Sequence, residues 1–291
     1  MKRIFLLFLM VAGAVYASAQ DTSIKSLCER EPVTTKWSLI SGDAQFASHY
    51  LNSQEYSGEI TGIEASHGRF YRKYDRLSWK LTMGHLRNMH RRLFDGGLIN
   101  AANTSYMSVQ SYDFDYAVFY NWLIKERLQL RVGGSFNLYG GFLFGDDNAV
   151  NNIISLDLQT QLYAQAQVRY GWDFKKYGLD LYANFATPFA GIMTVDERYE
   201  GFFESIPTSD FNLKEYSHLK FSSFNNLQGV NFEMGIDFAL RNLILSMSYE
   251  IKNRWWTAYE LQNYRKYSLV KLGVSVNLFS QQNRKASNRQ F

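Results

Sequence analysis

The sequence predicts an all-β protein, a transmembrane antiparallel up-and-down β-barrel of about ten strands. Three observations predict it. Apolar and polar residues alternate along many segments, which is the two-residue period of a strand. Many of these segments are about fifteen residues long, which exceeds the common length of soluble strands. Tight turns and longer loops also alternate along the chain, as in barrels with short turns at one rim and long loops at the other.

The N-terminus has the three parts of a signal peptide. Lys2 and Arg3 precede an apolar run over 4–15, and Ala17-Ser18-Ala19 follows as a small-x-small cleavage pattern. We therefore expect export and cleavage after Ala19, with the outer membrane as the destination. The expected organisation is a signal peptide, an N-terminal periplasmic segment, the barrel and a polar C-terminal tail, at 1–19, 20–35, 36–279 and 280–291.

Composition supports strands and excludes some partners. Tyr, Phe and Trp make up 16% of the chain, and it has only three prolines, which suits strands. Cys28 is the single cysteine, so no intramolecular disulfide can form. The formal net charge of +4 comes with no basic stripe interleaved with aromatics, so no nucleic-acid partner is expected.

The first five strands are expected over 36–50, 55–71, 76–90, 104–122 and 127–144. The first two alternate poorly and carry glycines. In the third strand Trp79 and Leu81 alternate with Lys80, and in the fourth Asp115 lies on the face opposite Tyr116. In the fifth, leucine and valine alternate with glutamine and with Arg131. Each pattern places one apolar and one polar side on a strand.

The last five strands are expected over 153–173, 178–194, 227–239, 243–257 and 264–279. The first of these is the clearest, because leucines at one parity alternate with Gln159 and Gln161. The strand over 178–194 follows a tight turn, and the other three alternate apolar side chains with residues such as Glu233, Glu250 and Lys271. The count becomes twelve if the loop over 194–226 contains a hairpin.

The alternation alone does not decide which face is inside, because a soluble lipocalin-like barrel also alternates. Strand length, the signal peptide and the aromatic strand ends favour a barrel with its apolar face toward lipid. Aromatic residues at strand ends form the interfacial girdles of such barrels. The expected girdle residues are Trp79, Tyr120, Trp122, Tyr170 and Trp172. Outer-membrane lipid is therefore an expected partner.

The last strand carries a second membrane signal. Its pattern, with Lys271, Gly273, Val276, Leu278 and Phe279, resembles the C-terminal assembly signal of outer-membrane barrels. It departs from that signal because Leu278 holds the usual aromatic position, with Phe279 after it, and because a polar tail follows. The resemblance implies recognition by the barrel-assembly machinery.

With the apolar face outward, the polar face lines the lumen. Opposite charges in a narrow barrel should pair rather than leave an open pore, since eight strands leave room only for side chains and sixteen or more form an aqueous channel. The expected lumen charge network is Asp113, Asp115, Arg131, Asp157, Arg169, Asp180, Glu233, Asp237, Glu250, Lys252, Arg254 and Lys271. A narrow channel for small solutes is the alternative.

Catalytic and metal chemistry have little support. His90 and His218 fall in or near long loops that also hold Asp95, Asp146 and Asp147, and such groups at a rim could activate water. Their spacing matches no motif, no serine stands in a nucleophile elbow, and no cluster has metal-ligand spacing. No catalytic residue, metal or cofactor is therefore assigned, and a rim protease or lipid hydrolase is kept as a second alternative.

The longest predicted loop mixes carboxylates with aromatics. Loops beyond about fifteen residues are often functional. The candidate ligand-binding residues are Asp196, Glu197, Arg198, Tyr199, Glu200, Phe202, Phe203 and Glu204. The loop could instead fold into the lumen, and a capping loop without a ligand is at least as good an interpretation. The sequence names no ligand.

Four short motifs resemble an uncharacterised family of exported Bacteroidales proteins of about 300 residues. They are the run from Leu51 to Gly58, the segment from Pro188 to Met193, the loop over 196–206, and Ser223-Phe224-Asn225. The resemblance covers 35–279. It implies an outer-membrane barrel and brings no activity and no catalytic residue. The expected function is a binding or structural role at the extracellular loop face.

Overall fold

The computed structural model describes the strands of the chain and one turn between two of them. The described residues are 33–47, 55–69, 74–92, 106–125, 128–145, 154–174, 177–194, 219–240, 243–258 and 261–276. The predicted signal peptide, the polar tail and the loop residues 196–204 lie outside these ranges. In the part of the chain so described, no helix is long and apolar enough to cross a membrane.

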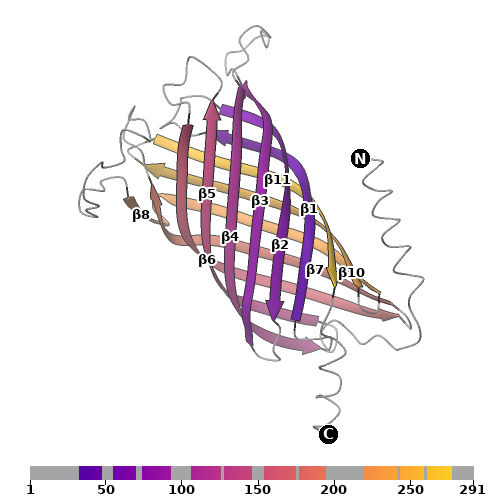
Figure 1. The fold of residues 1–291 in the computed structure, drawn as a ribbon. Helices are drawn as coiled ribbons and strands as arrows, with labels where there is room; N and C mark the ends of the chain where they lie inside the picture. The colour runs from indigo at the N-terminus through magenta and orange to yellow at the C-terminus, as the bar shows by residue number, and fades with distance from the viewer. Residues whose placement is uncertain are drawn as a thin grey trace, which may run out of the picture.

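The described residues form one antiparallel sheet (Figure 1). Its strands are β1 (Val33–Ala47), β2 (Glu55–Arg69), β3 (Tyr74–Arg92), β4 (Tyr106–Lys125), β5 (Leu128–Gly145), β6 (Ile154–Phe174), β7 (Tyr177–Thr194), β8 (Leu219–Ser223), β9 (Leu227–Leu240), β10 (Leu243–Ala258) and β11 (Leu261–Val276). The first strand pairs with the last, and β6 pairs with β7, so the sheet closes on itself. The predicted antiparallel barrel is confirmed.

The strand register fixes the dimensions of the barrel. A line that follows paired residues around the wall starts at Leu156 on β6 and returns to β6 at Val168, twelve residues along the strand. It passes through Phe142, Gln110, His85, Thr61, Ser41, Val270, Tyr249, Met234 and Ala183. With ten strands, this stagger corresponds to a tilt of roughly 40° and a radius of about 10 Å to the backbone. The steep slant of the strands is visible in Figure 1.

The wall contains ten strands because β8 continues the course of β9. Both pair with β7, and the turn over 224–226 separates them. Asn226 holds this turn. Its Oδ1 accepts a hydrogen bond from the Ser223 N–H at 2.7 Å, and its Nδ2 donates to the Phe221 carbonyl at 3.3 Å. The described part of the predicted 194–226 loop therefore lengthens one wall strand and adds no hairpin to the barrel.

The connections define two rims. We call the rim that carries connections 70–73, 126–127, 175–176 and 241–242 the turn rim. The opposite rim, with 48–54, 93–105, 146–153, 195–218 and 259–260, is the loop rim. The longer loop expected between the strands predicted over 243–257 and 264–279 is wrong, because Ala258 pairs directly with Leu261 and both belong to strands. The predicted ends of the ten wall strands lie within three residues of the observed ones; β1, for example, begins at Val33 instead of residue 36.

Candidate functional site

The lumen is the part of the barrel where charged side chains gather. Inward-facing residues occupy every second position of each strand. All twelve predicted network residues lie in described strands. Seven of them are less than a tenth exposed: Arg131, Asp180, Asp237, Glu250, Lys252, Arg254 and Lys271. Four more have side chains that are 13–15% exposed: Asp113, Asp157, Arg169 and Glu233. Their contacts form three layers between the turn rim and the loop rim.

The middle layer is centred on Lys271 of β11. Its Nζ lies 2.6 Å from Glu250 Oε2, 2.8 Å from Glu64 Oε2 and 3.5 Å from Glu233 Oε1. The three carboxylates come from β10, β2 and β9, so the ammonium group joins four strands. Glu64 is absent from the predicted network because β2 alternates poorly. Its parity is opposite to that of Ile63 and Ala65, the outward apolar residues of β2, and this would have placed it on the inner face.

Lys252 extends the middle layer across the lumen. Its Nζ lies 3.0 Å from Asp113 Oδ2 on β4 and 3.7 Å from Glu250 Oε1 on its own strand. Asn137 on β5 donates hydrogen bonds to both Asp113 and Asp115, the second at 2.8 Å. The Lys252 ammonium group thus joins a carboxylate of β4 to one of β10 in the middle of the barrel.

The layer nearest the turn rim is centred on Arg169 of β6. Its guanidinium pairs with Asp237 Oδ2 at 2.6 Å and lies over the Tyr182 ring, 5.5 Å from the centroid. Lys36 approaches the same ring at 5.9 Å. In this layer Arg131 donates hydrogen bonds to Asn121, at 3.1 Å, and to Gln167. Asp180 is also buried and is the register partner of Asp237.

The layer nearest the loop rim is centred on Arg265 of β11, which the predicted network lacks. Arg265 is 1% exposed and pairs with Asp157. Its guanidinium lies 3.8 Å from the Tyr139 ring centroid and 4.8 Å from that of Trp256. The signal that would have found it is its parity, because Arg265 and Lys271 are both odd-numbered residues of one strand.

A hydrogen-bonded ladder along β6 connects two layers. Arg254 donates to the Tyr163 hydroxyl, which donates to Gln161 Oε1 at 2.7 Å. Gln161 donates to Gln159 at 3.0 Å, and Gln159 donates to Asp157 at 3.1 Å. The ladder ends at the partner of Arg265. Along this ladder each buried polar group has a hydrogen-bond partner, as burial favours. Other buried atoms of the described lumen, such as Ser38 Oγ and Ser246 Oγ, have none.

An apolar cluster fills the loop-rim half of the lumen. The alternation along the sequence did not predict this cluster, because it assigned polar residues to the inner face of each strand. It draws side chains from seven strands, β1, β2, β4, β7, β9, β10 and β11. Its members are Ile40, Ala44, Phe46, Tyr56, Ile60, Val109, Met193, Leu227, Trp256 and Leu269, each at most 5% exposed. Together with the charged layers, this cluster leaves the described lumen packed with side chains.

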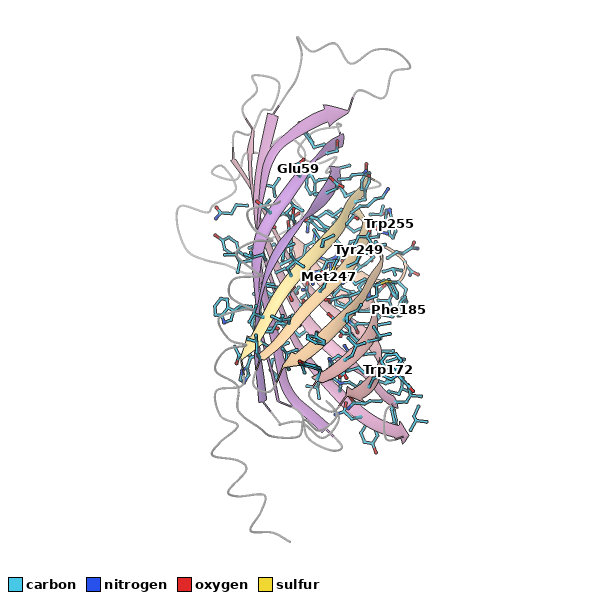
Figure 2. All side chains as sticks on the ribbon, turned by 90° about the vertical axis from the view of Figure 1, so that its right-hand side faces the viewer. Glu59, Trp172, Phe185, Met247, Tyr249 and Trp255 are labelled. Atoms are coloured by element: carbon cyan, nitrogen blue, oxygen red, sulfur yellow. The ribbon has the colours of Figure 1, made fainter. Side chains whose placement is uncertain are left out.

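The outer face is apolar. Large hydrophobic side chains that point outward are strongly exposed, such as Trp37 at 61% and Met247 at 58%. Two predicted girdle pairs are ring contacts near the turn rim: Tyr120 and Trp122 have centroids 4.6 Å apart, and Tyr170 and Trp172 have centroids 4.4 Å apart. Figure 2 shows Trp172 near that rim and Trp255 nearer the other. The side chain of the fifth girdle residue, at position 79, lies outside the described side chains.

The residues considered for catalysis at the loop rim are described only in part. Within the described ranges, no group of three or more His, Cys, Asp or Glu residues could hold a metal ion. The side chain of His90 and the whole of His218 lie outside those ranges, as do the loop candidates at 196–204. The three charged layers of the lumen keep paired ionic side chains buried inside the closed barrel wall.

Comparison with protein families gives one match. The family described as "Protein of unknown function (DUF3316)" matches residues 4–285, which is nearly the whole chain. Among curated proteins, none matches the sequence.

Several solved outer-membrane barrels are similar in fold. The outer-membrane protease OmpT from Escherichia coli is 8% identical, with a TM-score of 0.43 over 87% of this chain and 98% of that one. The translocator domain of the autotransporter NalP from Neisseria meningitidis is 8% identical, with a TM-score of 0.42 over 86% of this chain and 90% of that one. The attachment invasion locus protein Ail of Yersinia pestis is 10% identical, with a TM-score of 0.29 over 85% of this chain and 99% of that one. Their functions differ, so the likeness assigns none to this chain.

Proposed function

The chain belongs to the DUF3316 family, whose function is unknown, and we propose that it is a closed outer-membrane barrel that does not conduct. Its binding or structural role is performed at the loop rim, which faces the cell exterior. The turn rim then faces the periplasm, as the short turns of such barrels do.

The filled lumen is the observation that carries this proposal. A ten-strand wall with a radius of about 10 Å has room for little beyond its own side chains. The apolar cluster around Phe46 and Trp256 covers the ion pairs of Lys271 and Lys252 from the loop-rim side. A hydrated ion crossing the barrel would have to displace both the cluster and the ion pairs.

The outward surface supports a membrane location. Side chains such as Leu162, Val168 and Phe185 are 42–45% exposed on the outside, while lysines and arginines are buried inside. Water would favour the reverse arrangement, because burial of charge is costly and apolar exposure gains nothing. In a bilayer the exposed apolar side chains contact lipid, which is itself apolar, so their exposure is not unfavourable. Pairing of the buried charges reduces the cost of burying them.

The loop rim is the part of the molecule left for recognition. The lumen groups are bonded to one another, so few are available to a ligand. The connection over 195–218 is the longest in the chain, and its sequence combines carboxylates with Tyr199, Phe202 and Phe203. Long loops on a rigid barrel are common recognition sites.

Single-protein conductance in planar bilayers tests the closed lumen. We expect no steady conductance from the wild type. Trp256→Ala combined with Phe46→Ala removes two large side chains of the apolar cluster and should produce discrete current steps. Trp255→Ala is the matched control, because the neighbouring Trp255 points outward and is 40% exposed. Steady conductance of the wild type would instead support the narrow channel.

Surface labelling tests the orientation. A short epitope inserted after residue 206 should bind antibody on intact cells, whereas one inserted at 175–176 should bind only after the outer membrane is permeabilised. The opposite pattern would contradict recognition at the loop rim. A protease or lipase activity that disappears in His90→Ala and His218→Ala would support the enzyme alternative.

A further inference from the structure

The lipid-facing apolar surface is not equally tall around the barrel. On β6 the outward positions from Leu158 to Trp172 are apolar with one exception, Thr160. Among the outward positions of β1 from Thr35 to Gln45, only Trp37 and Leu39 are apolar. Glu59 of the neighbouring strand β2 is exposed, and Figure 2 labels it in the half of the barrel nearer the loop rim. The short side of the belt thus lies where the first strand meets the second.

The same shortening occurs on β2. Its outward apolar positions are Ile63 and Ala65, which are the register partners of Leu39 and Trp37. Thr61 bounds them toward the loop rim and His67 toward the turn rim. His67 Nδ1 lies 2.9 Å from Thr35 Oγ1, so the polar groups at the lower edge bond to each other. We call the outward side of β1 and β2 the short face.

The difference in height is large compared with a membrane. Six residues separate Thr35 from Ser41, which is about 15 Å along the axis of a barrel with strands tilted by roughly 40°. On β6 the run without a polar interruption, from Leu162 to Trp172, covers ten residues, or about 25 Å on the same basis. An apolar band is about 25 Å tall in barrels of this kind. The short face is therefore about 10 Å too short for a full-thickness bilayer.

A tilt of the whole barrel does not remove the mismatch. Tilting would move both edges of the belt in the same direction on one side. On the short face both edges move toward the middle, since Ser41 and Thr61 bound it from above and Thr35 and His67 from below. The bilayer must adapt there instead.

Charged groups directly above the short face make full-thickness lipid still less favourable. Asp43 and Glu59 are register partners, and both are exposed on the outer face. Lys266 of β11 is the register partner of Gln45, the next outward residue of β1. These groups need water or lipid headgroups around them. We propose that the short face binds a thinned patch of bilayer, in which headgroups descend to the level of Ser41 and Thr61.

Charge favours lipid over a second copy of this chain as the occupant. Asp43 and Glu59 lie side by side, so a two-fold contact centred on them would bring four carboxylates together. Lipid headgroups carry cationic groups and bound water, which can surround such carboxylates individually. The short face also lies beside the closure of the barrel, where β1 pairs with β11.

Folding into vesicles of different thickness tests the proposal. The wild type should fold much faster into thin bilayers, with dilauroyl chains, than into thick ones, with dioleoyl chains. Asp43→Leu with Glu59→Leu makes the short face taller and should reduce the thin-to-thick rate ratio about tenfold. Gln110→Leu with Gln228→Leu is the matched control, because both glutamines are exposed and lie on strands outside the short face. This pair should leave the ratio within about twofold of the wild type.

Two results would overturn the proposal. The first is an equal thin-to-thick ratio for the wild type and the Asp43→Leu/Glu59→Leu variant, both folded as shown by heat-modifiable gel mobility. The second is a disulfide-linked dimer formed in membranes by Leu39→Cys in a Cys28→Ser background, because a second copy would then cover this face. A spin label at Thr61 that meets water-soluble relaxants, beside one at Leu162 that does not, would support it.

Discussion

At the scale of single residues, Lys271 shows how the lumen tolerates charge. Its side chain is 1% exposed, and an isolated ammonium group buried to that extent would strongly destabilise the fold. Contacts with Glu64, Glu233 and Glu250 offset the lost hydration. Removing one member of such a cluster leaves the others uncompensated, which costs more than the cluster contributes as a whole.

Lys271→Met should therefore lower the free energy of unfolding by about 3–5 kcal/mol, since it leaves three carboxylates without their shared cation. Urea unfolding in detergent micelles, followed by tryptophan fluorescence, measures it. Lys266→Met is the control on the same strand and should cost less than about 1 kcal/mol, because that lysine lies outside the lumen. A comparable loss in both variants would contradict the central role of Lys271.

Arg265 depends on the shape of its side chain as well as on its charge. Its planar guanidinium lies against the rings of Tyr139 and Trp256, a geometry that an ammonium group does not reproduce. Arg265→Lys should lower the free energy of unfolding by about 1–2 kcal/mol although the charge is kept. The same urea titration measures it, and an unchanged midpoint would show that charge alone matters at this site.

At the scale of strands, close backbone contact explains some glycines. A Cβ added at Gly133 of β5 would lie 2.0 Å from the Val118 carbonyl oxygen of β4. Backbone atoms within a paired sheet cannot move aside as a side-chain tip can. At Gly140 of the same strand the nearest atom is Leu158 Cδ2 at 3.5 Å, an ordinary contact. The close approach of β4 and β5 therefore requires a glycine at position 133, whereas position 140 has room for a Cβ.

Gly133→Ala should separate β4 from β5 and reduce the folded fraction in lipid vesicles by several-fold, read as the heat-modifiable band on gels. Gly140→Ala is the control and should fold like the wild type, since alanine also loses less chain entropy than glycine on folding. If the two variants fold equally well, the close approach of β4 and β5 at Gly133 is wrong.

The turn between β8 and β9 depends on Asn226. Asn226→Ala removes two side-chain hydrogen bonds to the backbone and should cost about 1–2 kcal/mol of unfolding free energy. The neighbouring Asn225 is exposed, so Asn225→Ala should change the value by less than about 0.5 kcal/mol. Urea titration of both variants checks the pair, and similar losses would argue against the bonds assigned to Asn226.

At the scale of the whole molecule, closure and stagger decide what the lumen contains. A ten-strand wall with a stagger of twelve residues brings inward side chains from opposite walls within reach of one another. Seven strands can then build one apolar cluster, and Lys252 on β10 can reach Asp113 on β4. Side chains of this size fill a barrel of about 10 Å radius.

Closure itself is testable through the first and last strands. Ser41 and Val270 are register partners on β1 and β11. In a Cys28→Ser background, Ser41→Cys with Val270→Cys should form a disulfide, since antiparallel partners have the Cα separation that a disulfide requires. The product is a band of altered mobility on denaturing gels that reductant reverses. Ser41→Cys with Met234→Cys, which lie three strands apart, should give no such band; a band from this pair alone would contradict the strand order.

The alternation of residues was sufficient to predict the strands. A strand turns its side chains to opposite faces whatever it pairs with, so β4 to β7 and β9 to β11 could be located from the sequence within a few residues. β1 and β2 were less clear, and the reason is physical: their outward positions are apolar only around Trp37 and Ile63, so the pattern is brief. The gap between the strands predicted over 243–257 and 264–279 was too long because polar Asn263 belongs to β11 and is buried, where polarity marks the lumen and not a turn.

What the sequence by itself determined is the barrel and the identity of most of its inward charges, because parity along one strand is a local property. What only the tertiary structure decided is which of those charges meet. Lys271 and Glu64 are 207 residues apart in the chain, and Arg265 reaches Tyr139 across the lumen. These contacts depend on the stagger accumulated around the closed wall, which no single strand encodes. The apolar cluster and the short face follow from the same registers between strands.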